Sequence, residues 1–94
     1  MLSLEFLPEA EADMRRLYGF LSEVNAKAAV KAVDAILENI DLLRAHPDMG
    51  RRFETHPSLR EWTVRFGDNG YIIHYSVKND MLLIVRVWHT REAR

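Results

Sequence analysis

The sequence predicts an α+β fold with the element order β-α-α-β-β-β, in which an antiparallel sheet carries a helical hairpin on one face. Two long segments with helical spacing fill the first half of the chain, and three segments with strand alternation fill the second. With 94 residues, of which 48% are apolar and 29% charged, the chain fits one domain over residues 1–94 with a single core.

The first half reads as a short strand followed by two helices. Leu2, Leu4 and Phe6 alternate with polar residues, which is typical of a strand with one buried face. Pro8 suits the first position of a helix. Its predicted buried stripe is Ala10, Met14, Leu17, Tyr18 and Leu21, and its predicted outer residues are Asp13, Arg15 and Arg16. The second helix begins after an N-cap at Asn25 and ends before Pro47, so a short linker predicts an antiparallel hairpin.

The second half predicts a three-stranded antiparallel meander. A turn at 47–50 and an irregular connection at 51–57 precede it. The strands cover about 61–66, 71–77 and 81–89, and they are separated by turns at 67–70 and 78–80. Residues 81–85 are apolar without a break, which favours a strand buried on both faces.

Only two helices are available, so one face of the sheet is expected to lack cover from its own chain. The face predicted to lie under the helices is the more uniformly apolar one: Trp62, Val64, Phe66, Tyr71, Ile73, Tyr75, Leu83, Val85 and Val87. The predicted open face carries Glu61, Thr63, Arg65, Ile72, His74, Ser76, Leu82, Ile84, Arg86 and Trp88. An apolar patch rimmed by cations is typical of a protein-binding surface. The alternative is that the loop at 52–57 folds over this face.

Composition excludes several classes of function. The chain has no cysteine, so it has neither disulfides nor thiolate metal sites. Its net charge of −1 and pI of about 6.4 disfavour a broad nucleic-acid-binding surface. Metal-ligand, phosphate-loop and serine-nucleophile motifs are absent, so neither a cofactor nor a metal is expected. The N-terminus does not resemble a signal peptide, which predicts a cytoplasmic protein without a membrane partner.

Three segments in this element order carry a resemblance that spans essentially the whole chain. They are Pro47-Asp48-Met49-Gly50-Arg51, Tyr71-Ile72-Ile73-His74-Tyr75 and Ile84-Val85-Arg86-Val87-Trp88-His89-Thr90-Arg91. With them the chain resembles the ParE/RelE superfamily of toxins from bacterial type II toxin–antitoxin modules. The resemblance implies a cytoplasmic toxin that is neutralised in a hetero-oligomer by a cognate antitoxin, ParD-like or similar. The antitoxin alone would contact operator DNA.

The superfamily has two functional branches. ParE-like members inhibit DNA gyrase by binding it, whereas RelE-like members cut messenger RNA on the ribosome. For a ribonuclease, the candidates are Glu54 or His74 as base, Arg65 and Arg86 on the phosphate, and His89 as acid. The strand at 71–77 lacks the arginine that usually precedes its tyrosine in the RNA-cutting branch, and the chain is slightly acidic. We therefore favour the ParE-like branch, without an assigned catalytic residue.

Within this interpretation, two surfaces receive roles. The residues predicted to contact the target are Arg86, His89 and Arg91. The residues predicted to contact the antitoxin are Ile72, His74, Leu82, Ile84 and Trp88. For His89 the alternative is that it caps the end of its strand. A third possibility for the whole chain is a member that has lost toxicity and acts only in complex assembly and operon repression.

Overall fold

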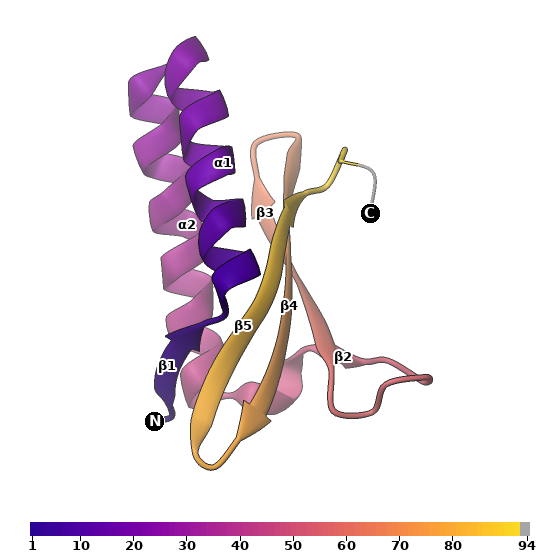
Figure 1. Ribbon diagram of the computed structural model, residues 1–94. Coiled ribbons are helices and arrows are strands. Elements are labelled where there is room, and N and C mark those ends of the chain that lie inside the picture. Colours follow the sequence, from indigo (N-terminus) through magenta and orange to yellow (C-terminus); the bar gives the residue numbers. More distant parts are fainter. Residues whose placement is uncertain (93–94) are drawn as a thin grey trace.

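A computed structural model describes residues 1–92 and consists of a helical hairpin packed on one face of a twisted sheet (Figure 1). The elements are β1 (Ser3–Phe6), α1 (Pro8–Val24), α2 (Ala26–Ala45), a 3-10 turn η1 (Pro47–Met49), β2 (Arg51–Arg52), β3 (Arg60–Phe66), β4 (Asn69–Lys78) and β5 (Met81–His89). The sheet has five strands in the order β1-β5-β4-β3-β2, with β1 parallel to β5 and the other pairs antiparallel. The predicted α+β class, hairpin and meander are confirmed, and β2 is additional.

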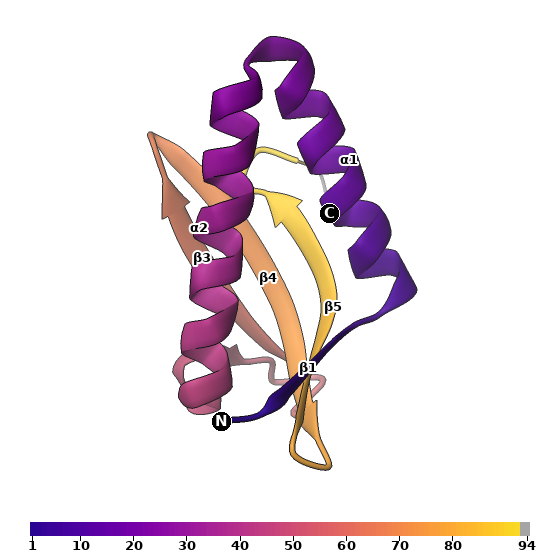
Figure 2. The same ribbon diagram turned by 90° about the vertical axis from the view of Figure 1, so that its left-hand side faces the viewer.

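One asparagine makes the link between the two helices. The Asn25 backbone N–H donates to the Leu21 carbonyl and ends α1, while its side-chain Oδ1 accepts from the Ala28 N–H at 3.1 Å and caps α2. This tight connection forces the helices to run antiparallel, and both lie in front of the sheet in Figure 2. In the described part of the chain, no helix combines the length and apolar character that a membrane crossing needs.

The core lies between the hairpin and one face of the sheet. Its fully buried members from the helices and strands are Ala10, Ala32, Ile36, Ile40, Leu43, Val64, Tyr71, Ile73, Tyr75, Leu82, Ile84 and Val87. The strand side chains of β1 pack against this cluster from its margin. Tyr18 was predicted to join the buried stripe of α1, but the structure leaves it 44% exposed.

A β-bulge in β5 changes the face to which several side chains point. His74 pairs with Arg86 and Tyr75 pairs with Ile84, so Val85 is the extra residue. Leu82 and Ile84 are therefore in the core, each 0% exposed, and their assignment to the open face was wrong. Leu83 and Val85 were wrongly assigned to the helix-covered face for the same reason. Because residues 81–85 are all apolar, the sequence alternation gave no sign of the bulge.

Asp13 was predicted to lie outside, yet it is 3% exposed. β1 pairs with β5 only as far as Ile84, so α1 flanks the remaining edge of β5. There the Asp13 Oδ2 accepts the Val87 N–H at 2.9 Å and the Arg86 Nε–H at 2.7 Å. Its Oδ1 accepts from Arg86 at 3.0 Å and from Arg16 at 3.1 Å. A helix side chain thus satisfies the strand edge where no neighbouring strand continues.

The ionised form of Asp13 is favoured in the folded state. Burial alone would raise its pKa, but the hydrogen bonds from Arg86, the Val87 N–H and Arg16 together outweigh this effect and lower the pKa below 3.8. A carboxyl whose pKa is lower in the folded than in the unfolded chain stabilises the fold above its unfolded pKa. That stabilisation is lost as the pH falls through the folded pKa.

We expect Asp13→Asn to lower the free energy of unfolding by roughly 2 kcal/mol at neutral pH, because the amide keeps one acceptor but leaves Arg86 without its counter-charge. The difference from the wild type should shrink below about pH 4, where the carboxyl of the unfolded chain begins to be protonated, and vanish as the pH falls through the lower folded pKa. Urea denaturation over a pH series measures both effects. Asp41→Asn, at an exposed carboxylate paired with Arg44, is the matched control. Equal stability of Asp13→Asn and wild type at neutral pH would contradict this account.

Candidate functional site

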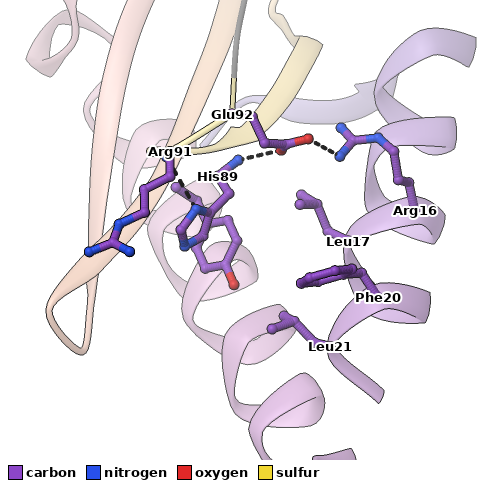
Figure 3. A pocket seen from close by; sticks show the side chains of 8 residues that line it. Arg16, Leu17, Phe20, Leu21, His89, Arg91 and Glu92 are labelled. Carbon is purple, nitrogen blue, oxygen red and sulfur yellow. Dashed lines mark hydrogen bonds and ion pairs between the residues drawn. The ribbon is translucent and has the colours of Figure 1, made fainter. Parts of the chain in front are cut away.

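A groove of about 560 Å³ lies between α1 and the C-terminal end of β5 (Figure 3). Its apolar wall consists of Leu17, Phe20, Leu21 and Tyr71, and its polar rim consists of Arg16, His89, Arg91 and Glu92. Leu17 and Tyr71 also belong to the core or its border, whereas Phe20 is 68% exposed. A largely exposed phenyl ring in a concave apolar site is a feature of binding surfaces more than of a monomer core.

The residues after β5 fold into a tight turn beside the groove. The His89 N–H donates to the Glu92 carboxylate at 2.8 Å, and the Glu92 N–H donates to the His89 carbonyl at 3.0 Å. The other oxygen of the Glu92 carboxylate pairs with Arg16 on α1 (Figure 3). The Arg91 side chain donates to Asn69 at 3.0 Å, which ties the turn to the start of β4. Residues 93–94 lie outside the described residues.

A second constellation lies on the sheet face that the helices do not cover. His74 Nε2 lies 2.8 Å from the Glu61 carboxylate, and the His74 ring makes edge contacts with Trp88 at 4.6 Å and Phe53 at 5.0 Å. The Arg86 guanidinium stacks over the Trp88 ring at 4.6 Å. This set, Phe53, Glu61, His74, Arg86 and Trp88, is called the sheet-face cluster below.

The loop at 52–57 contacts this face through Phe53. Phe53 is half-buried against His74, while residues 54–57, including the candidate base Glu54, are exposed. The alternative in which the loop folds over this face therefore holds at Phe53, and the side chains of His74 and Glu61 are 13% and 17% exposed. Ile72, His74 and Trp88, which were predicted to contact the antitoxin, lie together on this face, and Ile72 is paired with Trp88 in register.

The structure pairs the candidate base His74 with Arg86, but it does not bring Arg65, Arg86 and His89 of the candidate ribonuclease set together. Tyr71 and His89 are paired in register, and their rings contact at 5.4 Å, so His89 faces the groove on the helix side. Arg86 is paired with His74 and belongs to the opposite face. Arg65 is paired with Gly70, four residues along the strand from the row of Glu61 and His74, which is roughly 13 Å at about 3.3 Å per residue.

The charge of Arg86 is balanced inside the protein. Its pKa is raised chiefly by the hydrogen bond to Asp13, and this bond uses both the Nε and one Nη of the guanidinium. For the groove, burial raises the pKa of the Tyr71 hydroxyl, and the nearby Glu92 carboxylate raises it further. Within residues 1–92, there is no group of three or more His, Cys, Asp or Glu side chains that could hold a metal ion.

Sequence reasoning missed Asp13, Phe20, Glu61 and Glu92 as site residues. Asp13 and Phe20 each lie within one helical turn of Leu17, so helical spacing alone would have put them beside the buried stripe. Asp13 was predicted to be exposed because it carries a charge, and Phe20 was not included in the predicted stripe. The role of Glu92 depends on a turn formed by long-range contacts to Gly70 and Asn69, for which the local sequence has no signal.

The fold and these surfaces define a small α+β protein that presents a groove and an open sheet face to partners. The chain belongs to the ParE/RelE family of toxins from type II toxin–antitoxin systems, since a family model described as "ParE toxin of type II toxin-antitoxin system, parDE" matches residues 4–94. This membership implies a cognate antitoxin as partner.

Individual relatives agree with this family. The chain is 37% identical over 94 residues to "Toxin RelE3" of Caulobacter vibrioides, with 100% of both chains covered. It is 31% identical over 85 residues to "Toxin RelE1" of the same organism, covering 90% of this chain and 89% of that protein. A solved structure titled "Chromosomal ParDE TA system from P. aeruginosa" superimposes with a TM-score of 0.73 at 26% identity, covering 97% of this chain and 98% of the other.

Proposed function

We propose that this toxin acts in the cytoplasm by binding DNA gyrase, and that it does not cleave RNA. The observation that carries this proposal is the pairing of Arg86 with the buried carboxylate of Asp13. Cleavage of a phosphodiester needs cations whose charge is available to the phosphate in the transition state. The Arg86 guanidinium of the sheet-face cluster already has a counter-ion, so its capacity to stabilise a phosphate is reduced.

The arrangement of the other candidates supports the same proposal. A base, an acid and a phosphate-binding cation must converge on one scissile bond within hydrogen-bonding distance. His89 faces the groove, and Arg86 belongs to the other face of the sheet. Arg65 lies four residues along β3 from the row that contains Arg86. Binding, by contrast, requires only a shaped surface with apolar and charged groups, and the groove end of the molecule offers both.

For the contact with gyrase we propose the C-terminal end of β5 and the turn after it. His89 and Arg91 lie at the rim of the groove, and Arg86 lies on the other side of the same strand. For the contact with the antitoxin we propose the open sheet face around Ile72, His74 and Trp88. Operator DNA would be contacted through the antitoxin alone.

A ribosome-dependent messenger RNA endonuclease is the second candidate, and two observations favour it. Both relatives from Caulobacter vibrioides carry the name RelE. In addition, the sheet-face cluster contains a carboxylate–imidazole pair at 2.8 Å beside an indole ring, a combination that can transfer protons and stack on a base. In this candidate the working pair is His74, one of the two bases predicted from sequence, and Glu61, which was not predicted.

The two candidates differ in what happens when the toxin is induced. We expect DNA gyrase trapped on DNA and messages of normal length, and we expect Arg91→Gln to weaken gyrase inhibition by roughly tenfold if Arg91 contacts the target. Arg52→Gln, at an exposed arginine of the short strand β2, is the matched control. Gel assays of supercoiling and mapping of message ends read out both activities. Codon-positioned cleavage that His74→Gln abolishes, with normal supercoiling, would establish the second candidate instead.

The proposed antitoxin surface makes a separate prediction. Trp88→Ala should weaken antitoxin binding by about 2 kcal/mol, or roughly 30-fold, because it removes the ring on which Arg86 and His74 pack. Tyr18→Ala, an exposed aromatic on α1, is the control. Isothermal titration with the product of the reading frame beside the toxin gene measures the dissociation constant, and circular dichroism checks the fold. An unchanged dissociation constant in folded Trp88→Ala would show that the antitoxin covers another face.

A further inference from the structure

The rim of the groove has an excess of basic groups. Arg16 and Arg91 contribute guanidinium groups, whereas Glu92 is the one carboxylate that lines the groove in the described chain; the Nδ1 of His89 accepts the Arg91 N–H at 3.2 Å. Beneath the rim, Leu17, Leu21 and the exposed ring of Phe20 form an apolar wall (Figure 3). An occupant that matches both features is a segment with apolar side chains on one side and a carboxylate at its margin.

Arg16 is held by two carboxylates: Asp13 is buried, and Glu92 is partly exposed and also accepts the His89 N–H. One Nη donates to Asp13, which is buried and shares its charge with Arg86, and the other Nη pairs with Glu92. The side chains of Arg16 and Glu92 are 43% and 32% exposed. Ion pairs this accessible to water contribute little stability, so another carboxylate can replace Glu92 at small cost.

We propose that the groove binds an amphipathic segment of the antitoxin whose acidic side chain pairs with Arg16, and that Glu92 occupies this position in the free toxin as an internal competitor. The inference rests on the proposed function, because it takes neutralisation by an antitoxin as given. A segment in this groove would cover His89 and Arg91, which are the proposed gyrase contacts. It would thereby block the target surface directly.

Glu92→Gln tests the competitor role. The amide oxygen can still accept the His89 N–H, but the side chain no longer offers a negative charge to Arg16. We expect the dissociation constant of the antitoxin to fall by about two- to fivefold, which corresponds to the loss of one exposed ion pair. Glu11→Gln removes the exposed carboxylate that pairs with Arg15 on the outer side of α1, and it should leave the dissociation constant unchanged.

Two further variants identify the groove as the place of action. In an Arg16→Gln background, Glu92→Gln should no longer change the affinity, since the contested cation is gone. Phe20→Ser should weaken binding by roughly tenfold without loss of thermal stability, because the ring is already exposed, while Val24→Ser at the end of α1 should have no effect. All are measured by titration with the purified product of the adjacent reading frame.

The outcomes separate this inference from the proposed function. An unchanged or weaker affinity of Glu92→Gln overturns the competitor role, even if Trp88→Ala and the gyrase assays behave as proposed. An unchanged affinity of Phe20→Ser shows that the segment does not enter the groove. If Phe20→Ser instead abolishes self-association of the toxin in sedimentation, a second copy of the chain is the occupant. Failure of the wild type to bind the antitoxin at all overturns both proposals.

Discussion

The hydrogen bonds accepted by the Asp13 carboxylate hold together the end of the molecule that carries the groove and the sheet-face cluster. β1 accompanies β5 only to Ile84, and beyond that point Asp13 accepts the backbone N–H that a further strand residue would otherwise bind. Because a side chain of α1, and not another strand, binds this N–H, a space remains between α1 and the last residues of β5. This space is the groove. The same carboxylate fixes Arg86 and Arg16, so the groove and the sheet-face cluster share one buried anion.

The element order, the hairpin and β5 could be predicted because they rest on local signals: the N-cap at Asn25, helical spacing and strand alternation. The faces of β5 could be predicted only in part. A bulge at Val85 shifts the alternation, and an unbroken apolar run looks the same in either register, so Leu82 and Ile84 were placed on the wrong side. Asp13 was missed for a different reason. A buried charge is recognisable only through partners that lie far away in sequence, here Arg86 and the Val87 N–H.

The bulge also decides how the chemistry of β5 is distributed. After it, Arg86 and Trp88 belong to the open face and His89 belongs to the groove. Side chains that are close in sequence are therefore separated by the thickness of the sheet, which suits two contact surfaces better than one reaction centre. The Glu61–His74 pair is the exception, since it gathers an acid and a base on one face. Its neighbour Arg86 is compensated by Asp13, whereas Arg51, whose side chain is 70% exposed, pairs with Glu61 at 3.1 Å.

An antitoxin that covers both surfaces must pass from one face of β5 to the other. It cannot do so by adding a strand to the edge of β5 at Val87, because the Val87 N–H is bound to the buried carboxylate of Asp13. The remaining route leads over the turn at residues 90–92, where the carboxylate of Glu92 is the group most easily released. A segment that takes this route would reach Arg16 and displace Glu92 in the same step. The edge that Asp13 closes to strand addition thus directs a wrapping partner toward the groove.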